Sequence, residues 1–249
     1  MIMLKTVKEL ALMREACRIS AGALKVAGEA VEPGVTTAEI DKIAYDYIIK
    51  AGAKPAFLNY GGFPATACIS INDEIVHGIP SEKRIIKSGD IVSIDLGATI
   101  NGYVGDNAAT FACGEISAEA KRLCDTTRES LYEGISKAVA GGRLTDIGSA
   151  IQKYCEARGF SVVREYTGHG VGTKLHEDPS VPNFGTAGRG VRLLPGMTIA
   201  IEPMINMGLR RIKVMPDGWT AKTADGKLSA HFEHTIAITS DGPKIMTQL

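Results

Sequence analysis

The sequence has no excess of charge of either sign and no long apolar run. Its 249 residues include 28 Lys and Arg against 28 Asp and Glu, so no overall positive field favours nucleic acid or an anionic membrane surface. No apolar stretch approaches the ~20 residues of a membrane-spanning helix. The first residues lead directly into Lys8-Glu9, without the apolar core of a signal peptide. We expect a soluble, unexported protein that binds neither membranes nor specific nucleic acids.

Cysteine is scarce and lacks any CxxC spacing. The five residues, an odd number, are Cys17, Cys68, Cys113, Cys124 and Cys155. This pattern argues against a disulfide framework or a zinc knuckle and fits reduced thiols in the cytoplasm. Hydrophobic residues at 45% and charged residues at 22% are typical of a folded globular protein. The length allows one large domain or two small ones.

Two predicted helices begin with capping-box sequences. Thr6-x-x-Glu9 opens a helix to about Val31, and Thr36-x-x-Glu39 opens a second one that Gly52 ends. Short apolar runs then predict strands, and apolar residues at helical spacing predict two further helices before a second group of strands. The strands are expected at 67–69, 91–94, 108–111, 197–201 and 232–238, and the later helices at 123–139 and 147–154.

This order of helix pair and strands occurs twice, which suggests a duplication. Ala30-Val31 and Gly34 match Ala138-Val139 and Gly142 at an offset of 108 residues, and after a one-residue gap four further positions match at 107. Those four pairs are Ile40 with Ile147, Tyr47 with Tyr154, Gly52 with Gly159, and Gly89 with Gly196. We predict one domain over 1–249, built from two pseudo-symmetric halves of about 1–112 and 113–249.

Two aspartates are predicted on one face of a hairpin. Asp95 and Glu202 end equivalent strands of the repeat, where a charge is costly unless it is paired or bound to metal. Asn101-Gly102 predicts a tight turn, which makes Asp95 and Asp106 diagonal neighbours with Cα atoms roughly 7–8 Å apart. Such carboxylates suit two metal ions about 3.5–4 Å apart, although a single strand aspartate also serves as a turn or cap acceptor.

One histidine and two glutamates extend this set. His169 lies among three glycines, Glu202 ends a run without other charge, and Glu233 alternates with apolar neighbours. With the two aspartates, these residues form an oxygen-rich set with one imidazole, which suits divalent ions of the Mn, Fe or Co kind better than a thiolate zinc site. His231 and His234, which flank this glutamate, are interpreted as residues on the wet face of a surface strand.

A series of short motifs occurs in a specific order. They are Ile94-Asp95 with Asp106 eleven residues on, Gly168-His169-Gly170-Val171-Gly172, His176-Glu177-Asp178-Pro179, Pro195-Gly196-Met197-Thr198, Ile201-Glu202-Pro203-Met204, Asp217-Gly218-Trp219 and Phe232-Glu233-His234-Thr235. In this order they resemble the type I methionine aminopeptidases over nearly the whole chain. The resemblance implies an α+β pita-bread fold, an internally duplicated antiparallel sheet with two pairs of helices packed on its outer face. It also implies the bare bacterial catalytic unit, without the type II insertion or an N-terminal extension.

The resemblance further implies a dinuclear metal site. Asp95 would chelate one ion, Asp106 and Glu233 would bridge both, and His169 and Glu202 would bind the other. A bridging water acidified by two cations would be the nucleophile, and Glu202 the group that accepts its proton. The cofactor would be two divalent ions, Co, Mn, Fe or Zn, with the cellular metal left open.

A substrate site follows from the same resemblance. His77 and His176 match the two histidines that steady the scissile amide and its developing oxyanion. The methionine pocket is matched by aromatic residues and a thiol, which receive a thioether well, with His77 at the edge. Leu175 stands where many members carry an aromatic residue and Phe63 where many carry Tyr, which leaves the tightness of the pocket open. The pocket residues are Tyr60, Phe63, Cys68, Leu175 and Trp219.

The activity implied is metal-dependent removal of the initiator methionine from nascent polypeptides whose second residue is small. Two alternatives are an Xaa-Pro-type pita-bread aminopeptidase, which usually carries an additional N-terminal domain, and a non-enzymatic binding module of the same fold. We expect a monomer. A transient ribosome contact through Lys83, Arg84 and Lys87 stays open beside the simpler interpretation that these charges form an ordinary solvated face.

Overall fold

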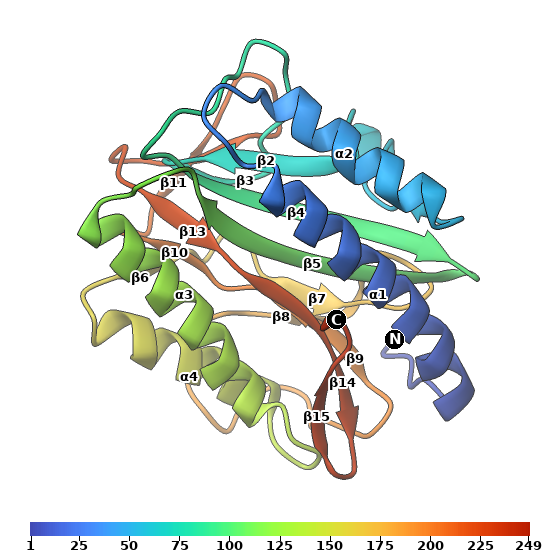
Figure 1. The fold of residues 1–249 in the computed structure, drawn as a ribbon. Helices are drawn as coiled ribbons and strands as arrows, with labels where there is room; N and C mark the ends of the chain where they lie inside the picture. Colours follow the sequence, from blue (N-terminus) through green and yellow to red (C-terminus); the bar gives the residue numbers. More distant parts are fainter.

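Four helices cover one face of a curved antiparallel sheet in the computed structural model, which describes residues 1–249 (Figure 1). The sheet contains nine strands, and each paired strand in it is antiparallel to its neighbours. The helices are α1 (Val7–Glu29), α2 (Thr37–Lys50), α3 (Ala118–Lys137) and α4 (Leu144–Glu156). The predicted α+β pita-bread fold with two helix pairs is confirmed.

Local hydrogen bonds explain where the first two helices begin. The Glu9 amide donates to Thr6 Oγ1 at 3.3 Å and the Thr6 amide donates to the Glu9 carboxylate at 2.7 Å. The Glu39 amide and Thr36 repeat this arrangement at 3.2 and 2.7 Å. Such caps contribute about 1 kcal/mol each, and both predicted capping boxes are confirmed.

The third helix is shorter than predicted. It ends at Lys137, with Ala138 as its C-cap, so Val139 lies outside the helix with 42% of its surface exposed. The chain turns at Gly141, whose φ is +88°. This left-handed conformation suits glycine because no Cβ is present to clash, and it stops the apolar periodicity from continuing as helix.

The central path of the sheet runs β1-β4-β5-β14-β9-β7-β8, with β2 on β4 and β15 on β14. Two three-stranded sheets, β13-β10-β6 and β11-β12-β3, complete the fold together with a 3₁₀ turn. The strands of the main sheet are β1 (Lys54–Pro55), β2 (Ala67–Ile71), β4 (Ile91–Ile100), β5 (Tyr103–Ala112), β7 (Gly168–Gly170), β8 (Glu177–Val181), β9 (Thr198–Ile201), β14 (Glu233–Thr239) and β15 (Gly242–Ile245). The others are β3 (Glu74–Val76), β6 (Ser161–Val162), β10 (Met204–Asn206), β11 (Ile212–Val214), β12 (Ala221–Thr223) and β13 (Ser229–His231), and the 3₁₀ turn is η1 (Tyr60–Gly62).

Equivalent backbone features recur at the predicted offset. One isolated β-bridge joins Thr36 to Ile85 and another joins Arg143 to Arg192. The second bridge repeats the first at an offset of 107 residues at both ends. The left-handed glycine equivalent to Gly34 is Gly141 rather than the predicted Gly142, so the one-residue gap precedes this turn instead of following it. The duplicated fold is thus visible in the backbone, while the division near residue 112 stays a prediction.

The hairpin of β4 and β5 has the predicted register. Ile100 pairs with Tyr103 and Gly97 with Asp106. Asn101 and Gly102 both have positive φ, 54° and 79°, as a two-residue type I′ turn requires. Because side chains alternate between the faces of a sheet, Asp95 and Asp106 lie on the same face.

Two apolar clusters fill the space between helices and sheet. One contains Leu123 and Ile147 beneath α3 and α4, and the other contains Ile40 and Ile94 beneath α1 and α2. Each fully buried side chain of this kind contributes about 1.5–3 kcal/mol. None of the four helices combines the length and apolar character needed to cross a membrane.

Candidate metal centre

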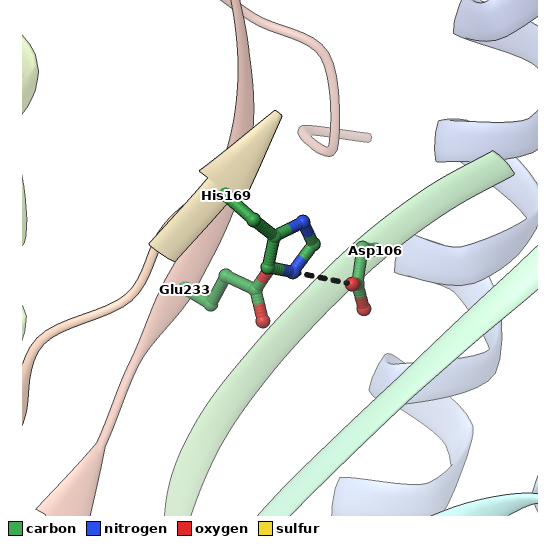
Figure 2. A group of neighbouring side chains, drawn as sticks. All are labelled: Asp106, His169 and Glu233. Carbon is green, nitrogen blue, oxygen red and sulfur yellow. Dashed lines mark ion pairs between the residues drawn. The ribbon is translucent and has the colours of Figure 1, made fainter. Parts of the chain in front are cut away.

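The five predicted metal-ligating side chains come together around one cavity. Asp106 lies on β5, His169 on β7 and Glu233 on β14, and Glu202 directly follows β9. Asp95 lies in the middle of β4 and not at the end of a strand as expected, because β4 continues through the hairpin to Ile100. The Nε2 atom of His169 lies 3.6 Å from Asp106 Oδ2 and 3.6 Å from Glu202 Oε1. Figure 2 shows His169 between the carboxylates of Asp106 and Glu233. Residues from five different parts of the chain therefore form one compact donor set.

The carboxylates lose hydration and gain few protein partners in exchange. Loss of hydration raises the pKa of Asp95 to about 7 and that of Glu202 to about 8. The same cause, followed by repulsion from neighbouring carboxylates, raises the pKa of Asp106 and of Glu233 well above the ordinary range. One oxygen each of Asp95, Asp106 and Glu233 is buried without any hydrogen bond.

Such a set is stable when a cation balances it. Buried carboxylates close together repel one another, and a hard or borderline divalent cation with oxygen and imidazole ligands removes both the repulsion and the missing contacts. The donor atoms of Asp106, His169 and Glu233 lie within 4.8 Å of one another, which is close enough to share an ion. The residues fit a divalent metal site.

Two glycines fix the position of His169. A Cβ on Gly168 would collide with the carbonyl oxygen of Ala200, and one on Gly170 would collide with that of Asp178. His169 Nδ1 lies 2.8 Å from the Gly170 carbonyl oxygen, so we assign the proton to Nδ1 as its donor. Burial lowers the pKa of His169 to about 4. The neutral ring therefore presents the Nε2 lone pair to the carboxylates, which is the form that binds a metal.

An apolar pocket adjoins the donor set within the same cavity of about 240 Å³. The rings of Phe63 and Trp219 meet edge to face with centroids 5.2 Å apart, and the ring centroid of His77 lies 6.3 Å from that of Trp219. His176 Nδ1 lies 2.8 Å from the hydroxyl oxygen of Tyr60. Every predicted pocket residue lines the cavity: Tyr60, Phe63, Cys68, His77, Leu175, His176 and Trp219.

Several lining residues were not predicted. Tyr166 packs edge to face on His77 with centroids 5.2 Å apart, and Met204 lines the wall beyond Glu202. Their closeness in sequence to His169 and Glu202 is the only signal that could have marked them. The other unpredicted members are Phe57, Gly61, Val76 and Thr167.

The interpretation of His231 as a surface residue is wrong. It ends β13, opposite Met204 of β10, with only 1% of its surface exposed. Its Nε2 lies 3.6 Å from Glu202 Oε2. The sequence alternates here, but β13 pairs with β10 behind the site rather than extending the surface, so the side chain points inward. His234 is half-buried instead, and its Nδ1 lies 2.9 Å from the hydroxyl of Thr247.

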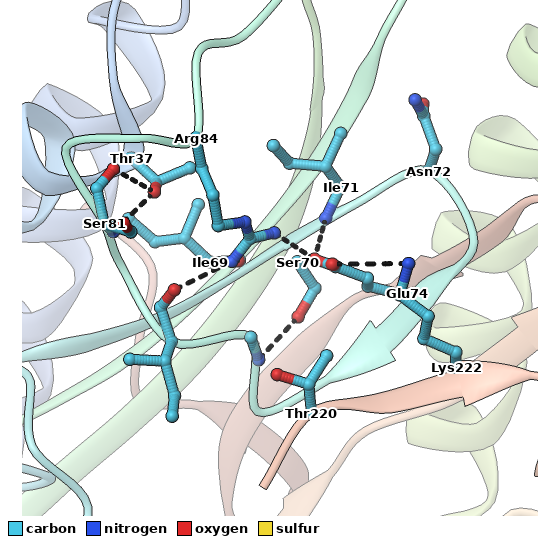
Figure 3. Close-up of polar contacts among 12 residues, drawn as sticks. Thr37, Ile69, Ser70, Ile71, Asn72, Glu74, Ser81, Arg84, Thr220 and Lys222 are labelled. Carbon is cyan, nitrogen blue, oxygen red and sulfur yellow. Dashed lines mark hydrogen bonds and ion pairs between the residues drawn. The ribbon is translucent and has the colours of Figure 1, made fainter. Parts of the chain in front are cut away.

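The interpretation of Arg84 as a solvated charge is also wrong. Its guanidinium donates to the carbonyl oxygens of Ile79 at 2.8 Å and Ile69 at 3.2 Å and pairs with Glu74 (Figure 3). Lys222 of β12 reaches the other oxygen of Glu74 at 3.7 Å. The contacts of Arg84 with Ile69 and Ile79 fix both ends of the segment between these two residues, which carries His77. Lys83 and Lys87 are exposed, as expected.

His77 itself has an unusual backbone. Its φ is +60°, a left-handed conformation that costs a non-glycine residue energy. The next residue is held on both sides, since the Gly78 amide donates to Ser70 Oγ at 3.1 Å and the Ile69 amide donates to the Gly78 carbonyl at 2.8 Å. Burial lowers the pKa of His77 to about 4, so a neutral imidazole faces the cavity.

Known proteins resemble this chain in sequence and fold. The profile of metallopeptidase family M24 matches residues 11–240. Methionine aminopeptidase 1 of Bacillus subtilis is 52% identical to this chain over 249 residues, and the alignment covers 100% of both chains. The crystal structure of methionine aminopeptidase from Thermotoga maritima has a TM-score of 0.99 at 45% identity, with 100% of both chains covered. The prolidase from Pyrococcus horikoshii has a TM-score of 0.78 at 28% identity, over 98% of this chain and 63% of the longer one.

Proposed function

This chain belongs to metallopeptidase family M24, and on that premise we propose that it removes N-terminal methionine from polypeptides whose second residue is small. The observation that carries the proposal is the shared cavity, where five metal-ligating side chains adjoin a pocket of aromatic, aliphatic and thiol groups. An aminopeptidase needs both parts side by side, because the first side chain of the substrate must be held while the first peptide bond reaches the reactive centre. The full-length similarity to methionine aminopeptidases supports the choice of methionine.

Two divalent cations are the proposed cofactor. Asp95 would hold one ion, His169 and Glu202 would hold the other, and Asp106 and Glu233 would serve both. The unpartnered oxygens of three of these carboxylates support the assignment. The chemistry that such ions would supply is a lower pKa for water and polarisation of a carbonyl group. Co, Mn, Fe and Zn all suit these donors, so availability decides among them.

The protein groups supply proton transfer and orientation. Glu202 is the proposed proton acceptor, because its carboxylate lines the cavity beside the other proposed ligands, and coordination to a cation makes it a weaker base than a free carboxylate. His77 and His176 are the proposed contacts to the scissile amide and its developing negative charge. The Tyr60 hydroxyl, 2.8 Å from His176 Nδ1, orients that ring.

The thioether of the substrate is proposed to lie between Phe63, Trp219 and Cys68. The edge-to-face rings leave an apolar wall against which sulfur packs favourably. Burial raises the pKa of Cys68 well above its ordinary value, so the thiol stays neutral and acts as a small apolar group. Leu175, also buried, closes the pocket with an aliphatic side chain.

We further propose that the substrate partner is the N-terminus of a nascent polypeptide, met in the cytoplasm by a monomeric enzyme. Five cysteines without disulfides support a reducing compartment. The exposed Lys83 and Lys87 leave a transient ribosome contact open, whereas Arg84 is engaged internally.

A panel of three peptides tests the specificity. We expect the protein with added Mn(II) or Co(II) to release methionine from a Met-Gly peptide at least about tenfold faster than from a Met-Leu peptide, since binding a misfitting side chain costs about 1–3 kcal/mol. An Ala-Pro peptide is expected to stay intact. Mass spectrometry of the products measures all three rates.

Each other outcome points elsewhere. Cleavage of the Ala-Pro peptide in preference to Met-Gly would favour an Xaa-Pro peptidase. The prolidase from Pyrococcus horikoshii has a similar fold. Absence of any cleavage with every metal would favour a non-enzymatic binding module. The Glu202→Ala variant is the matched control, because it retains the pocket and removes the proposed proton acceptor.

A further inference from the structure

His231 is a buried imidazole whose ring nitrogens have no partner. Its backbone is fixed by Thr110, which accepts from the His231 amide at 3.0 Å and donates to the His231 carbonyl at 2.9 Å. Both Nδ1 and Nε2 are buried without a hydrogen bond. Buried polar atoms without partners are rare in folded proteins, so this ring marks a place where an interaction forms during function.

The ring faces Glu202. His231 Nε2 lies 3.6 Å from Oε2 of that carboxylate, and His169 Nε2 lies 3.6 Å from its other oxygen, Oε1. Glu202 is therefore flanked by two imidazoles, one on each oxygen. No other protein group donates a hydrogen bond to this carboxylate, although its main-chain carbonyl accepts one from Asn183 at 2.9 Å.

The two imidazoles present different groups at Nε2, a lone pair in one ring and an N–H in the other. His169 uses its Nδ1 proton on the Gly170 carbonyl and so offers a lone pair at Nε2. His231 has no acceptor at Nδ1, which leaves its single proton free to lie on Nε2, facing Oε2. A shift of a few tenths of an ångström brings 3.6 Å into hydrogen-bond range. Groups that hydrogen-bond a metal-ligating carboxylate in this way set its orientation and basicity.

We propose that His231 is a positioning residue, whose Nε2–H holds Oε2 of Glu202 and so turns Oε1 toward the metal centre. The proposal rests on the proposed function, since it assumes that Glu202 binds metal and accepts a proton. His231 is not among the residues that line the substrate cavity, and one ligand atom each of His231, Glu202 and Glu233 lie within 4.8 Å of one another. Its effect is therefore expected on turnover and metal affinity rather than on substrate binding.

A matched pair of variants separates hydrogen bonding from packing. His231→Gln keeps an N–H donor, and His231→Met has similar length and no donor. We expect His231→Met to lower kcat and the Mn(II) affinity of the metal-stripped protein by about 10–100-fold each. His231→Gln is expected to stay within about threefold of wild type, and KM for a Met-Gly peptide is expected to stay unchanged in both. His234→Gln, on a side chain that contacts Thr247 outside the cavity, is the control.

Isothermal titration of the metal-stripped proteins with Mn(II) gives a readout independent of activity, and the absorption spectrum of the Co(II) forms gives a second. Equal kcat and affinity in His231→Met and wild type would overturn the proposal. A loss in His231→Gln as large as in His231→Met, with a shifted Co(II) spectrum, would overturn it in favour of direct ligation. Should His231→Met not fold, His231→Leu takes its place, with thermal unfolding as the check.

Failure of this proposal is distinguishable from failure of the proposed function. Wild type that neither binds Mn(II) nor cleaves the Met-Gly peptide contradicts the function itself. Wild type that does both, beside variants that match it, contradicts only the role of His231.

Discussion

Glu233→Gln is expected to lower kcat for a Met-Gly peptide by about a thousandfold or more at saturating metal. Glu233 belongs to a cluster with Asp106 and His169, in which one ligand atom of each residue lies within 4.8 Å of the other two. The substitution keeps the shape of the side chain and removes its charge and one strong ligand oxygen. Losing about 4 kcal/mol of the stabilisation that metal ions give the transition state corresponds to roughly a thousandfold in rate. Asp106→Asn is expected to behave alike.

Single-turnover rates at several Mn(II) concentrations measure this effect and separate it from weaker metal binding. Glu133→Gln, an exposed residue of α3, is the matched control and is expected to be indistinguishable from wild type. Turnover of Glu233→Gln within tenfold of wild type at saturating metal is incompatible with a bridging role for this residue.

The metal-free protein is expected to lose stability as pH rises from about 7 to 8.5. Loss of hydration raises the folded-state pKa of Asp95 to about 7 and that of Glu202 to about 8. A carboxyl group with a raised folded-state pKa stabilises the folded state fully below its ordinary pKa, and this contribution declines as pH rises and is gone once pH exceeds the raised value. Asp106 and Glu233, with pKa values raised further, act in the same direction.

The buried histidines act at lower pH. Burial lowers the pKa of His77, His169 and His234 to about 4, so these residues favour folding above the ordinary histidine pKa and lose that contribution as pH falls toward 4. Above about pH 7 they change little, which leaves the carboxylates to dominate the chosen window.

Thermal unfolding from pH 7 to 8.5 tests the sign. The Tm of metal-free protein is expected to fall by roughly 4 °C or more, since each kcal/mol shifts the Tm of a protein this size by about 2–4 °C. The rise in Tm on adding Mn(II) is expected to grow over the same range, because the cation binds ionised carboxylates. An Asp95→Asn, Glu202→Gln double variant should show a smaller slope, to which Asp106 and Glu233 still contribute. A Tm that is constant or increasing in metal-free wild type would be inconsistent with these pKa shifts.

Local sequence signals predicted much of the fold because their physical causes are local. Thr6-x-x-Glu9 begins a helix through hydrogen bonds between residues three apart. Asn101-Gly102 fixes the register of β4 and β5, since only one two-residue turn suits its positive φ values. That register placed Asp95 and Asp106 on one face before any tertiary contact was known.

The residues that escaped prediction depend on contacts between distant segments. His231 is buried because β13 pairs with β10, a choice that alternation along its own strand does not reveal. Arg84 is held by carbonyl oxygens of Ile69 and Ile79, acceptors that every residue type offers and no motif marks. Tyr166 lines the pocket by packing on His77, 89 residues earlier in the chain. The proposed metal-ligating set was recognisable because its residue types are chemically restricted.

The most direct test of the account is a metal titration of turnover. Metal-stripped protein is mixed with increasing Mn(II), and methionine release from a Met-Gly peptide is followed at each step. The account predicts no release without metal, an increase that saturates with no more than two ions per chain, and release from Glu233→Gln that stays slower by about a thousandfold or more at every metal concentration. Full turnover in metal-stripped protein that retains less than one-hundredth of an ion per chain would contradict it.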